Sequence, residues 1–180
     1  MNPELLACVD ALSSPNTSAE DRSRHKSVLL SIVPSQVRFT ELLRGMGTYL
    51  THTETHIRRL STLLLADTLA CAKGLKLTAA EATHVCQFFC RRLADYPSVG
   101  PCLKALTAFA RHHADVLEAE CAPRVAKQVF KAVHVPAMEQ QLRMAVFRLF
   151  ELLMSIPKYE GRIRQCCFVT GDISSSMCGG

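Results

Sequence analysis

A helical pattern that recurs about every 40 to 45 residues most strongly constrains how this chain folds. Predicted helices begin in pairs, near residues 36 and 54, 79 and 98, and 123 and 137. A short connection joins the two helices of each pair, so each pair forms an antiparallel hairpin. A single hairpin cannot bury both of its apolar faces, whereas stacked hairpins share one continuous core. The sequence therefore predicts an all-α solenoid.

The segment from Thr53 to Gly74 carries the strongest of these patterns. Ile57, Leu60 and Leu64 recur at steps of three and four residues, and neighbouring apolar residues widen the stripe. Thr53 is suited to cap the start of a helix, and Gly74 is suited to the left-handed conformation that closes its end. We predict a helix that is buried on more than one side.

Three such hairpins occupy residues 35–74, 78–113 and 122–156, within a repeat domain that spans residues 35–157. Ser35 is expected to cap the first helix, and Pro123 suits the first turn of the fifth. Thr78 and Glu81 have the spacing of a capping box for the helix that follows them. Two helices in a unit of this length are typical of HEAT repeats.

The two ends of the chain depart from the repeat. Residues 1–34 are predicted to form a short N-terminal helical segment with two helices. Residues 158–180 diverge from helical periodicity and are rich in small and polar residues, so we expect a disordered tail, above all from about residue 170. The helix of about residues 137–156 is apolar enough to expect another repeat against it, which indicates a truncated chain.

Composition narrows the class of protein. At 180 residues, with 48% hydrophobic and 21% charged residues, the chain resembles an ordinary soluble domain. We find no basic and apolar signal segment at its start and no apolar run long enough to span a bilayer. Its nine cysteines are an odd number, and most lie in apolar stripes, which favours reduced thiols. We expect a protein of the cytoplasm and nucleus that does not bind membranes.

Residues with metal-binding or catalytic chemistry do not form a recognisable site. Cys86 and Cys90 share one helix face and supply at most half of a zinc site, because no C-x-x-C pair exists to complete it. His84 does not share that face. The phosphate-binding loop, the dinucleotide fingerprint and the G-x-S-x-G motif are also missing. We predict no catalytic residue, no metal, no cofactor and no enzymatic activity.

Basic residues are the candidates for a partner surface, although the net charge is only +5. They form a ridge on the solenoid if they converge, and they are solvated helix faces if they do not. The chain has no Trp, and its Phe residues occupy predicted core positions, so base stacking is disfavoured and a protein partner is favoured over nucleic acid. The candidate residues are Arg58, Arg59, Arg91, Arg92, Arg111, Lys127 and Lys131.

Three segments, in order, are LLRGMGTYLTHTETHIRRLSTLLLADTL, VCQFFCRRLADYPSVGPCLKAL and VFKAVHVPAMEQQLRMAVFRLFELLM. Together with the VHV motif at Val133 to Val135, they resemble the N-terminal region of the MMS-nineteen proteins, HEAT-repeat adaptors named for methyl methanesulfonate sensitivity. Each segment alone is a common apolar helix pattern, and their order and spacing make the match specific. The resemblance covers about residues 35 to 170, and the chain departs from the family beyond Phe168.

This resemblance implies a non-catalytic scaffold in the cytosolic iron-sulfur protein assembly targeting complex, which hands clusters to apoproteins of DNA replication and repair. It also implies a link to nucleotide excision repair and to transcription. The implied partners are other subunits of that complex and the apoprotein clients, with no small-molecule substrate. The alternative that the residues leave open is a nucleic-acid-binding or transcription-associated α-solenoid.

Overall fold

The computed structural model describes residues 2–72, 74–133, 137–159 and 161–163. Within these ranges the regular secondary structure is entirely helical, which confirms the predicted all-α class. The elements in chain order are α1 (Pro3–Ser13), α2 (Ala19–Ile32), α3 (Phe39–Leu50), α4 (Thr55–Cys71), α5 (Ala79–Arg92), the 3₁₀ helix η1 (Tyr96–Ser98), α6 (Val99–His112), α7 (Cys121–Ala132) and α8 (Gln140–Ser155).

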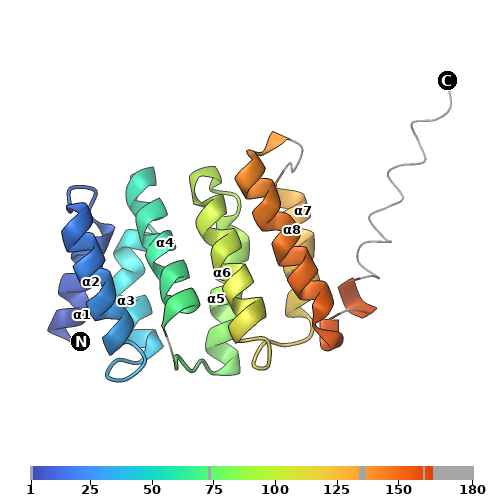
Figure 1. The fold of residues 1–180 in the computed structure, drawn as a ribbon, viewed down its shortest axis with the longest axis horizontal. Helices are drawn as coiled ribbons and strands as arrows, with labels where there is room; N and C mark the ends of the chain where they lie inside the picture. The colour runs from blue at the N-terminus through green and yellow to red at the C-terminus, as the bar shows by residue number, and fades with distance from the viewer. Residues whose placement is uncertain (1, 73, 134–136, 160, 164–180) are drawn as a thin grey trace.

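The helices lie in two layers (Figure 1). The front layer contains α2, α4, α6 and α8, and the rear layer contains α1, α3, α5 and α7. Consecutive helices pair into hairpins, and neighbouring hairpins join through α4 with α6, α6 with α8, and α5 with α7. Across the described ranges, the extensive helix contacts stay within a hairpin or link sequence neighbours. The molecule is therefore the predicted α-solenoid of stacked helix hairpins.

Helix α4 is buried on several sides, as its wide apolar stripe predicts. Leu65 is 0% exposed and Leu64 is 5% exposed. The polar residues Ser61 and Thr68 are also buried, and each hydroxyl donates to the carbonyl one turn earlier, Ser61 to Ile57 at 2.9 Å and Thr68 to Leu64 at 2.9 Å. These local bonds remove the cost of burying a hydroxyl without a partner.

The ends of α4 differ slightly from the prediction. The helix begins at Thr55, one residue later than predicted, with Glu54 rather than Thr53 at the capping position and no side-chain cap. The Thr53 carbonyl accepts from Arg58 Nη1 at 2.6 Å. Gly74 has the expected positive φ of 80°, but the helix has already ended at Cys71. Gly74 therefore turns the connection to α5 rather than closing α4.

Two further helix starts differ from prediction and one agrees. Helix α3 begins at Phe39 rather than near residue 36, and Ser35 does not cap it; its hydroxyl donates to the Ser31 carbonyl at 2.9 Å, at the end of α2. Helix α8 begins at Gln140 rather than near residue 137. The capping box of α5 is present, since Thr78 Oγ1 accepts from the Glu81 amide at 3.2 Å and Glu81 Oε2 accepts from the Thr78 amide at 2.9 Å.

The N-terminal helical segment is a hairpin of its own. Helices α1 and α2 pack on each other, and α1 also contacts α3 and α4. Polar residues of α2 also bond to both of its neighbours. Lys26 pairs with Asp67 of α4, and Arg22 donates to the Leu12 carbonyl of α1 at 2.8 Å. Asp67 pairs with Lys104 of α6 as well, so one carboxylate connects three successive hairpins. The stack thus has four hairpins in the described residues.

The first residues of the expected tail continue the fold. Residues 157–159 and 161–163 are helical, and both Tyr159 and Ile163 are buried in the core. The Tyr159 hydroxyl donates to the Ala114 carbonyl at 3.1 Å, in the connection between α6 and α7. The disorder expected from about residue 170 lies outside the described residues. None of the helices in the described ranges has the length and hydropathy to cross a bilayer.

Candidate functional site

A groove of about 450 Å³ between α5 and α7 brings together three of the predicted basic residues. Arg91 lines it from α5, and Lys127 and Lys131 line it from α7. Arg124 of α7 lines the same groove, although it is not among the predicted residues. Its position, three residues before Lys127 and seven before Lys131, places all three on one helix face, which is the sequence signal that identifies it.

The four groove cations are exposed and have no acidic partner in the part of the chain that the structure describes. Each has an exposed side chain. Among the described residues, none of them forms an ion pair with a carboxylate. Like charges at this spacing repel one another, so an anionic ligand in the groove relieves that repulsion. The remaining polar lining consists of Gln87 and Gln128, whose amides both donate and accept hydrogen bonds.

Three thiols form the floor of this groove. Cys86 and Cys90 lie one turn apart on α5, as predicted, and Cys121 joins them from the first residue of α7. The periodicity of one helix does not predict this third thiol, because stacking of hairpins brings it there. No group of three or more His, Cys, Asp or Glu in the described part of the chain is arranged to hold a metal ion.

The three thiols differ in acidity. Hydrogen bonding to its two neighbours, together with burial, raises the pKa of Cys86. Donation by the Cys86 thiol, supported by the Thr83 hydroxyl and opposed by burial, lowers the pKa of Cys121 to about 6. Since the Cys86 thiol has one proton, it stabilises one neighbouring thiolate at a time. Cys121 is the favoured neighbour, because it stands at the positive N-terminal end of α7 while Cys90 stands near the negative C-terminal end of α5.

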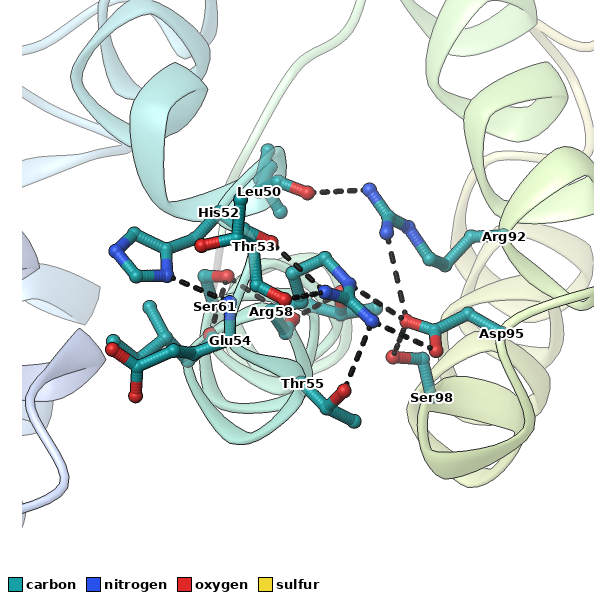
Figure 2. Close-up of polar contacts among 12 residues, drawn as sticks. Leu50, His52, Thr53, Glu54, Thr55, Arg58, Ser61, Arg92, Asp95 and Ser98 are labelled. Carbon is teal, nitrogen blue, oxygen red and sulfur yellow. Dashed lines mark hydrogen bonds and ion pairs between the residues drawn. The ribbon is translucent and has the colours of Figure 1, made fainter.

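Arg58 and Arg92 are used within the fold rather than at the groove (Figure 2). Arg58 Nη1 donates to the carbonyls of His52 at 2.9 Å and Thr53 at 2.6 Å, and its guanidinium pairs with Asp95 at 3.3 Å. Arg92 donates to the Leu50 carbonyl and pairs with Asp95 at 3.6 Å. Both side chains are largely buried. Through these contacts the two arginines hold the α3–α4 connection against the end of α5. We call Arg58, Arg92 and Asp95 together the clamp.

The clamp shifts the acidity of Asp95. Burial raises the pKa of this carboxyl, but hydrogen bonds from Arg58 and Ser98, with the charges of Arg58 and Arg92, outweigh burial and leave the pKa lowered. A carboxyl whose pKa is lower in the folded chain stabilises the fold above its unfolded pKa of about 3.9. That stabilisation is lost as pH falls through the lower, folded pKa.

We therefore expect the stability advantage of the wild-type chain over the Asp95→Asn variant to depend on pH. The difference in unfolding free energy should be constant above about pH 5. It should shrink below about pH 4, where Asp95 becomes protonated in the unfolded chain while the folded chain still keeps it charged. Urea denaturation from pH 3 to pH 7 measures it. The exposed Asp115→Asn variant is the control. A difference that grows as pH falls would contradict this account of Asp95.

Arg59 and Arg111 lie apart from both the groove and the clamp. Arg59 is on α4 and Arg111 is near the end of α6, so both belong to the front layer, and both are exposed. The groove is formed by two helices of the rear layer. The predicted basic residues therefore divide among three places, and only Arg91, Lys127 and Lys131 converge.

Within the described ranges no aromatic residue lines the groove, so these residues provide no platform on which nucleic-acid bases stack. Its volume is in the range of sites that hold a small molecule or a short peptide segment. With four cations on its walls, its chemistry suits a ligand that carries several carboxylates.

Comparison with known proteins places these features in a family. A family model for the N-terminal region of MMS19, described as a Dos2-interacting transcription regulator of RNA-Pol-II, matches residues 43–175. The MMS19 nucleotide excision repair protein homolog of Dictyostelium discoideum is 24% identical over 129 residues, which is 71% of this chain and 11% of that protein. Its Arabidopsis thaliana counterpart is 28% identical over 140 residues, 77% of this chain and 12% of that protein.

The chain thus spans about a tenth of the length of these relatives. The matched region includes α4 to α8 and all the residues that line the α5–α7 groove.

Proposed function

This chain belongs to the MMS19 family, a family of repair-related adaptors, and we propose that it is a non-catalytic scaffold whose α5–α7 groove binds an acidic segment of a protein partner. The observation that carries the proposal is the convergence, in one groove between two stacked hairpins, of four cations that have no acidic partner among the described residues. A solenoid presents such a surface on a fixed frame, which limits the conformational entropy lost on binding.

The proposed occupant is a protein segment rather than nucleic acid. Proteins that bind single strands combine a basic channel with aromatic side chains, and the described residues of the groove are basic but include no aromatic side chain. The charge of the whole chain is only +5, which is modest for a surface that follows a phosphate backbone. Glu and Asp side chains pair with Arg and Lys at short range, and the two groove glutamines are placed to bond a peptide backbone.

We further propose that this docking serves iron-sulfur protein assembly in the cytoplasm and nucleus. The support is the family membership together with the function that the family resemblance implies. On this proposal the partners are other targeting-complex subunits or apoproteins of DNA replication and repair. The chain contributes docking alone, because its groove presents cations and glutamine amides to the partner.

Charge reversal in the groove tests the docking proposal. Arg91→Glu combined with Lys127→Glu should weaken binding of a labelled Glu- and Asp-rich peptide by about tenfold or more, because two attractions become repulsions. The matched control is Arg59→Glu with Arg111→Glu, which makes the same change of net charge on the front layer and should alter binding by about twofold or less. Fluorescence anisotropy at two salt concentrations measures both.

Two results would contradict the proposal. Equal losses in the two double variants would show that binding depends on overall charge rather than on the groove. Tighter binding of a single-stranded oligonucleotide than of the peptide, at matched charge and salt, would favour the nucleic-acid-binding solenoid instead. Circular dichroism of each variant establishes that the helical fold is retained.

A further inference from the structure

The thiols in the groove floor have chemistry that adaptor binding does not use. Cys86, Cys90 and Cys121 are free thiols, and all three line the groove beneath the basic residues. Cys121 is 4% exposed. The void on its core side is about 10 Å³, which is too small for more than about one water. A reagent therefore reaches Cys121 from the groove, past the cations that line it.

Cys121 is the thiol placed to react. It is the first residue of α7, where the unpaired amides of the helix favour negative charge. The Thr83 hydroxyl of α5 lowers the pKa of Cys121, and its buried oxygen has no hydrogen-bond partner among the described residues, so it is free to donate to the thiolate. The charged and titratable groups around it are Cys86, Cys90 and Arg91 of α5, Arg124 of α7, Glu118 of the preceding connection and Tyr159 of the C-terminal segment.

We propose that Cys121 is a modification site for small disulfides that carry carboxylates, of the glutathione class, with the groove cations binding the carboxylates. Arg91, Arg124 and Lys127 line the same groove as the sulfur, so a ligand held by its carboxylates brings its disulfide to the floor. A thiol on the open surface has no such cations around it, so it does not select reagents by their charge. Cys71 of α4 is an exposed free thiol in the same chain, and it supplies the comparison.

The reaction is a thiol–disulfide exchange. The Cys121 thiolate attacks one sulfur of the disulfide, the sulfur–sulfur bond of the reagent breaks, and a bond forms between Cys121 Sγ and the attacked sulfur. The other half leaves as a thiolate and takes a proton from water. The protein thiol is oxidised, the reagent disulfide is reduced to one thiol, and no further oxidant is required.

The adduct would change what the groove binds. This effect on partner binding is the one part of the inference that rests on the proposed function. A glutathione group attached at Cys121 adds carboxylates beneath Arg91, Arg124 and Lys127 and occupies the space between α5 and α7. It would therefore compete with an acidic protein segment for the same cations. Reduction by an excess of thiol restores the groove, since the exchange is reversible.

The experiment uses the full chain, reduced and then exposed to glutathione disulfide or to the neutral 2-hydroxyethyl disulfide, with modified peptides counted by mass spectrometry. We expect the preference for the anionic reagent to be on the order of tenfold greater at Cys121 than at Cys71, because the groove concentrates anions. Arg124→Gln combined with Lys127→Gln should remove this preference at Cys121 without changing the rate at Cys71. Cys121→Ser should remove the modified peptide.

The pH profile supplies a second measurement. From pH 7 to pH 8.5 the rate at Cys121 should change by about twofold or less, because its pKa of about 6 leaves the thiolate already formed. Modification at Cys71 alone, equal charge preference at both thiols, or a rate at Cys121 that rises about tenfold or more over this pH range would each overturn the proposal. If Cys86 attacked the adduct and rapidly formed a Cys86–Cys121 disulfide, the reagent's group would be released. A stable adduct at Cys121 would then be ruled out.

These outcomes are distinct from those of the docking test. If the Arg91→Glu and Lys127→Glu variant loses peptide binding while the two thiols show no difference, the docking proposal stands and the modification proposal fails. If Cys121 shows the expected selectivity but the peptide does not bind, the modification proposal stands and the docking proposal fails. Peptide binding that is unchanged by the adduct would refute only its competition with the partner.

Discussion

Replacing Phe109 with alanine is expected to lower the free energy of unfolding by about 3 to 5 kcal/mol, the range for a buried phenylalanine. Phe109 is 1% exposed and lies in α6, which packs against α4, α5 and α8. Its ring meets Phe89 edge-on with centroids 6.5 Å apart and His113 with centroids 5.7 Å apart. Removing the ring leaves a cavity that closely packed neighbours fill only in part.

The matched control is Phe147→Ala in α8. Phe147 also lies within a front-layer helix, but it is 53% exposed. Its truncation should change the unfolding free energy by about 0.5 kcal/mol or less. Urea denaturation followed by circular dichroism measures both variants. If the two substitutions had equal effects, Phe109 would not occupy the shared core that the stacked hairpins form.

The sequence predicts the parts of this fold that local patterns determine. A stripe at steps of three and four residues identifies each helix, and the T-x-x-E spacing at Thr78 and Glu81 identifies a helix start, because both depend on contacts within one turn or two. The order of the hairpins follows from their spacing in the chain. These features do not require knowledge of which helix faces meet.

The differences arise where tertiary contacts compete with local preference. Thr53 is a suitable capping residue by type, but α4 begins at Thr55, and the Thr53 carbonyl accepts a hydrogen bond from Arg58. The polar sequence of α2 gives little amphipathic signal, yet Lys26 gains Asp67 of a neighbouring hairpin as a partner. Single-helix periodicity contains neither contact, so the two N-terminal helices are predicted correctly, whereas their packing on the next hairpin is not.

The candidate site shows the same division. The face of α7 that carries Lys127 and Lys131 is visible in the sequence. Its meeting with Arg91 of α5 depends on how two hairpins stack, and so does the arrival of Cys121 beside Cys86. Sequence pattern therefore identifies basic helix faces, whereas the structure selects those that converge and assigns Arg58 and Arg92 to the clamp.

The clamp leads to the second large effect, which is expected for Arg58→Ala. Removing this guanidinium leaves the Asp95 carboxylate and two carbonyls, of His52 and Thr53, without one of their donors in a largely buried setting. Arg92 and Ser98 still contact the carboxylate, so we expect a cost of about 2 to 3 kcal/mol, near the lower end of the range for breaking a buried pair.

The neighbouring Arg59→Ala is the control for this variant, since it removes the same side chain from an exposed position on the same helix. Its unfolding free energy should stay within about 0.5 kcal/mol of the wild type. A double variant, Arg58→Ala with Asp95→Ala, should recover part of the loss, because the carboxylate that lost one of its donors is then absent as well. If Arg58→Ala were as stable as Arg59→Ala, the α3–α4 connection would be held by apolar packing, and Arg58 would be free to serve a partner surface after all.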